Sequence, residues 1–365
     1  MATEAYRTRL SPAVFRLPVE RIRDGYYADA YFNFTKQLLE EQDRHPQVTM
    51  QVFQKEQSVL GGIDEAVAVV KQCSGRRLPD GRWEPGWQDL EVHALHEGDE
   101  IRPWETVMTI EGDYSLFTHL ETVYLGCLAR RTLVMRNVRE VVEAADGKPI
   151  LFFPARHDHW LVQTGDGWAA HVAGAIGVST DAQASWWGGR GVGTVPHGLI
   201  AAFGGDTVAA ARAFADRFAD EMNVVVLVDF ENDSVRTALE VADAVGAKLW
   251  GVRLDTSDKL VDRSLWAEMG EFDPTGVNPK LVERVREALD AAGHERVKIV
   301  ASGGFDSAKI RQFEQLGAPV DSYGVGSALL RGSNDFTADV VLVEGRPCAK
   351  AGRTHHPNSR LERVE

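Results

Sequence analysis

The sequence predicts an α/β protein in which a series of parallel strand–helix units follows a smaller α+β domain. From about residue 115 onward, short apolar segments alternate with helical segments roughly every 25–45 residues, which is the pattern of parallel βα units. Before that point the chain mixes helical periods with short alternating strands. A length of 365 residues suits two domains, or one large barrel with an appendage.

The N-terminal part contains the signals of a compact α+β domain. Tyr31–Gln42 has helical spacing with a polar face, and Val48–Phe53 alternates as a strand does. A helix is expected in GGIDEAVAVVKQ, directly after two glycines. Short strands are expected at Glu91–Leu95 and Glu105–Met108, joined by charged loops. We therefore expect residues 1–114 to form the N-terminal domain.

The stretch 115–334 has the pattern of a barrel domain. It begins with LFTHLETVYLGCLARRTLVMRNVREVVEAA, which predicts one long helix or two short ones. Strands are then expected in KPILFF, NVVVLVDF, KLWGVRL, KIVAS and SYGVG, with helices between them. These units predict a barrel or a doubly wound sheet. The tail, 335–365, has strand character in VVLVEGRPCAKAGR, and we expect it to return to the first domain.

Composition and charge narrow the classes of protein. Hydrophobic residues make up 44% and charged residues 26%, which is ordinary for a globular chain with a sizeable core. The net charge of −14 argues against nucleic acid or an anionic membrane as a partner. No apolar run approaches the ~18 residues of a membrane span, and the polar start lacks the apolar core of a signal peptide.

Cysteine usage indicates a reducing compartment. Cys73, Cys127 and Cys348 lie far apart, are odd in number and lack metal-ligand spacing. We expect neither a disulfide framework nor a structural zinc ion, and the cytoplasm fits.

Chemically active residues gather where five of the expected strands end. In parallel βα folds, catalytic groups lie at the carboxyl ends of the strands. A single aspartate there is more often a helix cap, and a single glycine pair is more often a turn. Five such ends together favour a site. They carry Arg156; Asp229; Arg253 and Asp255; Ser302, Gly303 and Gly304; and Gly324, Gly326 and Ser327.

The glycine-rich ends predict phosphate binding, because glycine lets backbone N–H groups approach a phosphate closely and a helix start adds positive partial charge. Arg253 and Asp255 lie two residues apart, so a strand places both on one face. Arginine can hold a phosphate, and aspartate a ribose hydroxyl or the shell of a Mg²⁺ ion. A local salt bridge is the plainer alternative.

His197 is a candidate reactive histidine in the glycine-rich loop WGGRGVGTVPHGLI. A lone histidine is usually structural, but this one lies between candidate strand ends. Asp229 on the next strand could orient its ring, which is the usual way in which a histidine tautomer is fixed.

The ordered motifs FFPAR, VSTDA, GTVPHGLI, VDFEND, GVRLDTSD, ASGGFD and YGVGSALL resemble those of the nicotinate phosphoribosyltransferases, part of the type II phosphoribosyltransferases. DAYF and EGDYSLFTHLETVYLGCLARRT are also similar. The resemblance implies an N-terminal α+β domain on an incomplete α/β barrel. It further implies a homodimer or higher homo-oligomer with shared active sites, and transfer of a phosphoribosyl group from phosphoribosyl pyrophosphate to nicotinate in NAD salvage.

For the base, the resemblance implies that Phe153 and Tyr31 stack on the pyridine ring, with Tyr31 donated by the neighbouring subunit, and that Arg156 lies beside it. The orientation of Asp181 would decide which of two bases the site accepts. In the pocket it would accept from the amide of nicotinamide, whereas turned toward a cation such as Arg156 or Arg190 it would leave the site to nicotinate. Nicotinate is the expected base and nicotinamide the first alternative.

For the donor, the resemblance implies that Arg253 and Asp255 hold ribose and phosphate. Mg²⁺ would be carried by the donor near Asp255 rather than by a set of protein ligands. His197 would be phosphorylated by ATP, a co-substrate, with Asp229 as its partner. The 5′-phosphate would be held by Ser302, Gly303, Gly304, Gly324, Gly326 and Ser327.

Two further alternatives remain. One is a decarboxylating enzyme that uses quinolinate, whose second carboxylate calls for a denser cationic pocket. The other is a catalytically silent barrel that acts as a sensor or scaffold. Release of pyrophosphate with each base in turn would separate these alternatives.

Overall fold

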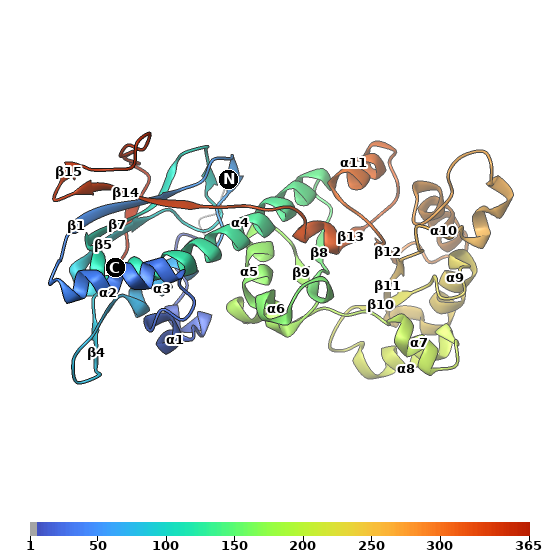
Figure 1. Cartoon of the computed structure of the whole chain (residues 1–365). Helices are drawn as coiled ribbons and strands as arrows, with labels where there is room; N and C mark the ends of the chain where they lie inside the picture. The colour runs from blue at the N-terminus through green and yellow to red at the C-terminus, as the bar shows by residue number, and fades with distance from the viewer. Residues whose placement is uncertain (1–5) are drawn as a thin grey trace. The chain divides into compact units, whose positions relative to one another are not determined.

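The computed structural model describes residues 6–365, which divide into two compact units (Figure 1). Of the described residues, the first unit comprises 6–136 and Gly332–Glu365, and the second comprises Asn137–Arg331. Their boundary falls inside helix α4 (Glu121–Ala144), whereas the change in sequence pattern put it near residue 115. The two positions differ because the helical period starts with the helix, while the tertiary contacts of its side chains change part way along it.

An antiparallel sheet lies at the centre of the first unit, with its strands in the order β15-β14-β1-β7-β5-β16. Strand β1 pairs with β14 on one side and with β7 on the other, both antiparallel. Figure 1 shows red β14, from late in the chain, beside blue β1. The strands are β1 (Gln47–Phe53), β5 (Leu90–Ala94), β7 (Thr106–Asp113), β14 (Thr337–Val343), β15 (Arg346–Pro347) and β16 (Glu362–Arg363). Two small sheets pair β2 (Ser58–Val59) with β6 (Glu100–Ile101), and β3 (Gly75–Arg77) with β4 (Trp83–Pro85).

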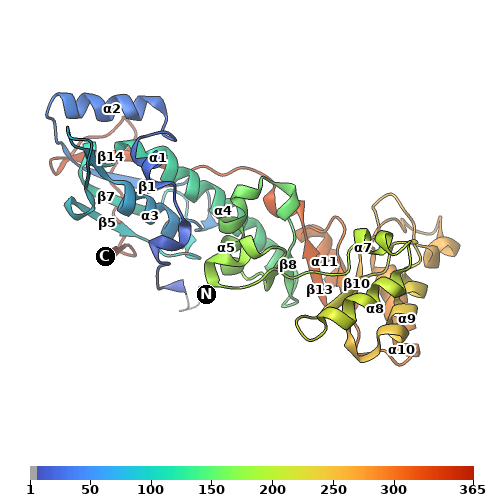
Figure 2. The same ribbon diagram turned by 90° about the horizontal axis from the view of Figure 1, so that it is seen from below.

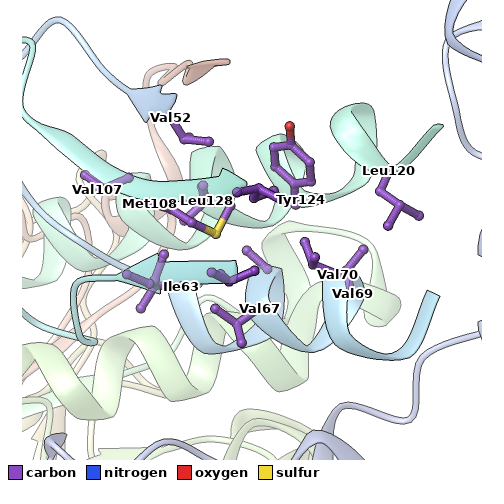
Figure 3. Close-up of a cluster of buried hydrophobic side chains, with 14 of the residues drawn as sticks. Val52, Ile63, Val67, Val69, Val70, Val107, Met108, Leu120, Tyr124 and Leu128 are labelled. Carbon is purple, nitrogen blue, oxygen red and sulfur yellow. The ribbon is translucent and has the colours of Figure 1, made fainter. Parts of the chain in front are cut away.

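Helix α3 (Ile63–Cys73) supplies much of the core of the first unit. Its sequence, IDEAVAVVKQC, is apolar around most of the helix, and eight of its residues are buried. Figure 3 shows Val67 and Val70 of this helix in one cluster with Met108 of β7 and Leu128 of α4. The remaining helices of this unit are α1 (Val19–Arg23) and α2 (Ala30–Glu41).

A parallel sheet forms the second unit, with its strands in the order β10-β11-β12-β13-β8-β9. Helix α8 packs beside β10, α9 beside β11 and α10 beside β12. Figure 2 shows these three helices together near β10. The strands are β8 (Ile150–Phe152), β9 (Gly177–Val178), β10 (Val224–Leu227), β11 (Leu249–Leu254), β12 (Lys298–Ala301) and β13 (Ser322–Val325). The helices are α5 (Gln163–Ala173), α6 (Asp181–Ala184), α7 (His197–Ala202), α8 (Thr207–Phe218), α9 (Ser234–Val245), α10 (Pro279–Ala291) and α11 (Ser307–Gln315).

This parallel sheet is an incomplete barrel that is open between β9 and β10. The segment 192–195 lies in the gap. The N–H of Val192 donates to Val178 of β9 at 2.7 Å, and Val195 forms a parallel bridge with Val226 of β10. Pro196 follows and has no N–H to extend the pairing. The expected fold class, an incomplete α/β barrel with an N-terminal α+β domain, is confirmed.

Four of the described α-helices in the second unit begin at a side-chain cap. Thr180, Asp206, Asn278 and Asp306 accept the backbone N–H three residues further on, at 3.1, 2.8, 3.1 and 3.0 Å. Such caps satisfy N–H groups that would otherwise lack partners. Asp229 and Asp255 cap no helix in the described part of the chain, so the alternative of a capping role does not apply to them. Within residues 6–365, no helix has the length and apolar character needed to cross a membrane.

Candidate active site

A cavity of about 570 Å³ lies in the second unit at the carboxyl ends of its strands. Its wall consists mainly of the loops after β8, β9, β11, β12 and β13, together with the segment that occupies the gap before β10. The structure therefore brings together residues that are up to about half the chain apart in sequence. The predicted site residues in its wall are Phe153, Arg156, His197, Arg253, Asp255, Ser302, Gly303, Gly304, Gly324, Gly326 and Ser327.

Arg253, Asp255 and Ser302 form one hydrogen-bonded unit in this wall. Arg253 Nε donates to Ser302 Oγ at 2.7 Å, and Ser302 Oγ lies 2.8 Å from Asp255 Oδ1. The second oxygen of Asp255 lies 3.4 Å from an Arg253 nitrogen. Ser302 is nearly buried, so it fixes the two charged side chains rather than offering a free hydroxyl. The alternation of β11 does place Arg253 and Asp255 on one face, and the face is that of the cavity.

Asp255 is the carboxylate that a magnesium ion would meet. It is the one acidic residue in the described cavity wall. No group of three or more His, Cys, Asp or Glu side chains within residues 6–365 is arranged to hold a metal. Mg²⁺ needs about six oxygen ligands. A single carboxylate, already hydrogen-bonded to Ser302, would therefore not hold such an ion by itself and would suit one that a ligand carries.

His197 and Asp229 are also brought together. His197 begins α7, Asp229 follows β10, and His197 Nε2 lies 3.0 Å from Asp229 Oδ1. The hydrogen bond to Asp229 raises the pKa of His197 above its ordinary value. Asp229 is 7% exposed and His197 is 43% exposed, so the aspartate is fixed behind a ring that solvent and ligands can reach. With the proton on Nε2, the neutral ring presents Nδ1 as its free nucleophilic nitrogen.

The glycines of the site are required for two different physical reasons. Gly303 and Gly304 have φ values of +89° and +70°, a left-handed conformation that side chains rarely adopt. Gly324 has no such conformation. A Cβ there would lie 2.7 Å from the ring of Phe153, so glycine is needed for space. The ring that occupies this space also has the Arg253 guanidinium 5.0 Å from its centre.

Two predicted base residues do not line this cavity. Tyr31 belongs to α2 of the first unit and is 60% exposed. Asp181 is exposed at the start of α6, and its carboxylate accepts the N–H of Gly191 at 2.9 Å. In the described part of the chain it forms no ion pair with Arg156 or Arg190, so a backbone amide takes the place of the expected cation.

Ser179 and Thr180 line the cavity where Asp181 was expected. Their hydroxyls bond to Gln183 at 3.1 Å and to Gln163 at 2.9 Å. The strand before them, β9, has only two residues, which is too short to leave a pattern in the sequence. The strand-end rule would have found Ser179 and Thr180 if β9 had been recognised. The resemblance named their neighbour Asp181 instead, which does not line the cavity.

Comparison with known proteins gives a consistent set of relatives. Residues 29–132 match the family model described as the N-terminal domain of quinolinate phosphoribosyl transferase. The chain is 30% identical over 269 residues to a nicotinate phosphoribosyltransferase of Mycobacterium tuberculosis, which is 71% of this chain and 55% of that protein. The chain thus spans about half the length of these curated relatives.

Solved structures are similar over nearly the whole chain. A nicotinate-nucleotide pyrophosphorylase from Pyrococcus furiosus has a TM-score of 0.77 and 32% identity, covering 95% of this chain and 85% of that one. Human nicotinic acid phosphoribosyltransferase has a TM-score of 0.66 and 17% identity, covering 90% of this chain and 77% of that one. The second likeness concerns the fold alone.

Proposed function

Because this chain belongs to the type II phosphoribosyltransferases, the family of the nicotinate and quinolinate enzymes, we propose that it is a nicotinate phosphoribosyltransferase. The reaction joins nicotinate to the ribose of phosphoribosyl pyrophosphate and yields nicotinate mononucleotide and pyrophosphate. In this proposal it serves NAD salvage in the cytoplasm, a reducing compartment that accords with the three free cysteines.

The unit of Arg253, Asp255 and Ser302 carries the proposal. Displacement of pyrophosphate builds positive charge on the ribose ring, and the leaving group is a polyanion. An arginine and an aspartate fixed side by side can hold the diphosphate with its Mg²⁺ and orient the ribose hydroxyls. The left-handed Gly303 and Gly304 expose backbone N–H groups in the same wall. Positioning and electrostatics of this kind supply most of the rate in phosphoryl-bearing transfers.

The charges in the cavity favour nicotinate as the base. Arg253 lies against Asp255, and Arg331 lies 3.9 Å from Asp306. Arg156 makes no ion pair within residues 6–365, so it is the guanidinium with no carboxylate partner. One unpaired guanidinium matches the single carboxylate of nicotinate. Quinolinate has two carboxylates, and the neutral amide of nicotinamide needs no cation.

Release of pyrophosphate by the purified protein tests this proposal. Phosphoribosyl pyrophosphate and Mg²⁺ are supplied with nicotinate, nicotinamide or quinolinate in separate reactions, and the nucleotide product is identified by mass. We expect turnover with nicotinate at least tenfold above that with either other base. Preferential turnover with nicotinamide or quinolinate would identify a different transferase of the family. No turnover with any base would support the silent barrel.

ATP is proposed as a co-substrate that phosphorylates His197. The motivation is a partly exposed ring held by a buried aspartate, with Nδ1 free to attack a phosphoryl group. Incubation with γ-labelled ATP should leave acid-labile phosphate on the protein, and peptide mapping should place it at His197. A stable protein-bound label at a serine or threonine instead would contradict this assignment.

A second copy of the chain is proposed to complete the site with Tyr31. Tyr31, Phe34 and Leu38 are all more than half exposed and lie three or four residues apart, so they form one apolar stripe on α2. Exposed stripes of this kind commonly mark a protein interface. The test mixes two inactive variants, Tyr31→Ala and Arg253→Ala, under conditions that exchange subunits. Activity should reappear in the mixture if sites are shared, and a mixture that stays inactive would exclude sharing.

A further inference from the structure

His157 is a cavity residue that neither the sequence motifs nor the proposed function uses. It lies in the short helical turn Ala155–His157 directly after β8, and its side chain lines the cavity. Its backbone N–H donates to Pro154 at 2.8 Å, which fixes the turn. The imidazole itself makes no hydrogen bond or ion pair within residues 6–365. A ring fixed by its backbone and free at its nitrogens is available to a ligand.

The ring of His157 sits directly over Gly326. A Cβ built on Gly326 would lie 2.9 Å from His157 Cε1, 3.5 Å from Nδ1 and 3.9 Å from Nε2. The absence of a side chain at Gly326 therefore leaves the space that the His157 ring occupies. Gly324 makes room in the same way for Phe153, two residues earlier on the same strand end. The two glycines therefore seat two rings side by side, one apolar and one able to donate a hydrogen bond.

The surroundings of the His157 ring suit an anion. Gly326, Ser327 and Arg331 lie in the cavity wall at this end, and they contribute backbone N–H groups, a hydroxyl and a guanidinium. The one described acidic residue of the wall, Asp255, lies after a different strand and is bonded to Ser302. Imidazole donates through N–H in either protonation state, and a phosphate accepts such a bond strongly.

We infer that His157 is a binding residue for the 5′-phosphate of the ribosyl donor. This inference rests on the proposed function, because it takes the phosphoribosyl group as the substrate. Among the substrates, the donor has two separate anionic ends. Asp255 and Arg253 suit the diphosphate and its Mg²⁺, and His157 lies with the Gly326–Ser327 backbone at a different strand end. His157 is thus assigned to the end of the donor that does not react.

Steady-state kinetics and equilibrium binding with three variants test the inference. His157→Ala removes the imidazole and with it the hydrogen-bond donor, whereas His157→Gln keeps a side-chain N–H. The control is His159→Gln, two residues further on, where the ring is stacked on Trp160 and lies outside the cavity wall. His157→Ala should raise KM for phosphoribosyl pyrophosphate about ten- to hundredfold, the usual effect of losing a hydrogen bond to a charged group. KM for nicotinate should change less than twofold, His157→Gln should recover part of the loss, and the control should match wild type.

Binding of ribose 5-phosphate and of pyrophosphate, measured by calorimetry without any base, separates the two ends of the donor. His157→Ala should weaken ribose 5-phosphate at least tenfold and leave pyrophosphate within twofold. Weaker pyrophosphate binding alone, or a change confined to KM for nicotinate, would overturn the assignment. A wild-type protein that makes no nucleotide contradicts the proposed function instead, whereas an active wild type with unchanged donor binding in His157→Ala contradicts only this inference.

Discussion

Two histidines, one in each unit, show opposite ways of holding an ionisable ring. His197 is partly exposed in the second unit, and its hydrogen bond to Asp229 raises its pKa. His119 is 1% exposed in the first unit, and burial lowers its pKa to about 3. Neither ring nitrogen of His119 has a well-formed hydrogen bond within residues 6–365, and the weak contact with the backbone of Cys73 raises its pKa less than burial lowers it. The ring of Trp83 lies edge-on at 6.3 Å.

The difference separates polar groups that are positioned for chemistry, around His197, from polar groups that are buried in the core, around His119. His197 has Asp229 as its partner, and Arg253 has Ser302 and Asp255. Around His119, the hydroxyls of Thr118 and Tyr124 are also buried without a partner in the described part of the chain. Burial without partners costs stability and offers no access to a substrate. Substitutions around His197 should therefore change activity, and substitutions around His119 should change stability.

The largest effect is expected at Asp255. Asp255→Asn removes the charge beside Arg253 and Mg²⁺ while keeping the shape, so kcat should fall about 10²- to 10³-fold. KM for the donor should rise, and KM for nicotinate should change little. The thermal midpoint should stay within about 2 °C, since the residue is partly exposed and the cost of the lost contacts is small. Asp216→Asn, on the surface of α8, is the control.

A result in which Asp255→Asn keeps normal turnover and donor affinity would remove Asp255 from the site. A large fall in the thermal midpoint would show instead that Asp255, like His119, contributes mainly to stability.

The next effect is expected at His197. His197→Ala should retain slow synthesis without ATP but lose the stimulation by ATP, which we expect to be about tenfold or more, and the ATPase activity with it. His294→Ala is a matched control. His294 also contacts an aspartate, Asp243, at 2.7 Å, but it does not line the cavity. ATP hydrolysis and nucleotide synthesis are measured in the same reactions. Undiminished ATP stimulation in His197→Ala would rule out a phosphorylated His197.

A smaller effect is expected at Gly324. Gly324→Ala places a methyl group 2.7 Å from the ring of Phe153, so the ring must shift. We expect KM for nicotinate to rise about threefold to tenfold, because a stacked aromatic pair contributes roughly 0.5–1.5 kcal/mol. Gly126→Ala in α4, where nothing lies within 4 Å of the added group, is the control. Unchanged KM for nicotinate would mean that Phe153 does not hold the base.

His119 should affect activity least and acid stability most. Its folded pKa of about 3 lies below the ordinary value near 6.5, so its contribution to stability is complete above pH 6.5 and is lost as the pH falls toward 3. His119→Gln should reduce the acid dependence of the unfolding free energy by up to about 1.4 kcal/mol per pH unit in that window. Urea unfolding at several pH values measures this.

His45→Gln is the control for that slope. His45 is partly exposed, and its hydrogen bond to Asp113 raises its pKa, so its contribution is lost as the pH rises rather than as it falls. An unchanged acid slope in His119→Gln would show that the His119 ring is protonated, and therefore solvated or paired, in solution.

Much of the fold could be predicted from local sequence signals. The strands β1, β5, β8 and β10–β13 lie within a few residues of their expected positions, because each is a short apolar run bounded by turn residues. The helix α5 was not predicted, since QTGDGWAAHVA carries two glycines and reads as a loop. Pairing partners such as β14 with β1 depend on contacts between residues nearly 300 positions apart, which no local pattern encodes.

The site was predictable only where residues follow recognisable strands. Arg253, Asp255 and Ser302 were named, and the structure places them in one cavity wall. Ser179 and His157 were missed as cavity residues. The first follows a two-residue strand, and the second is one of several polar residues in a loop whose directions depend on packing against Gly326. Asp181 is the opposite case, a residue that was predicted for the site but does not line the cavity. Its carboxylate is held by the backbone N–H of Gly191, which the sequence does not reveal.

The position of β14, β15 and β16 near the end of the chain has a consequence for folding during synthesis on the ribosome. These strands make up half of the first unit's six-stranded sheet, yet they are translated only after the whole second unit. When residue 136 has been synthesised, β1 can pair with β7 but still lacks β14, so one of its edges has open N–H and C=O groups. The first unit is thus the first to be started and the last to be completed. Its β1 edge stays unpaired while some 200 further residues are synthesised, at about 5–20 residues per second.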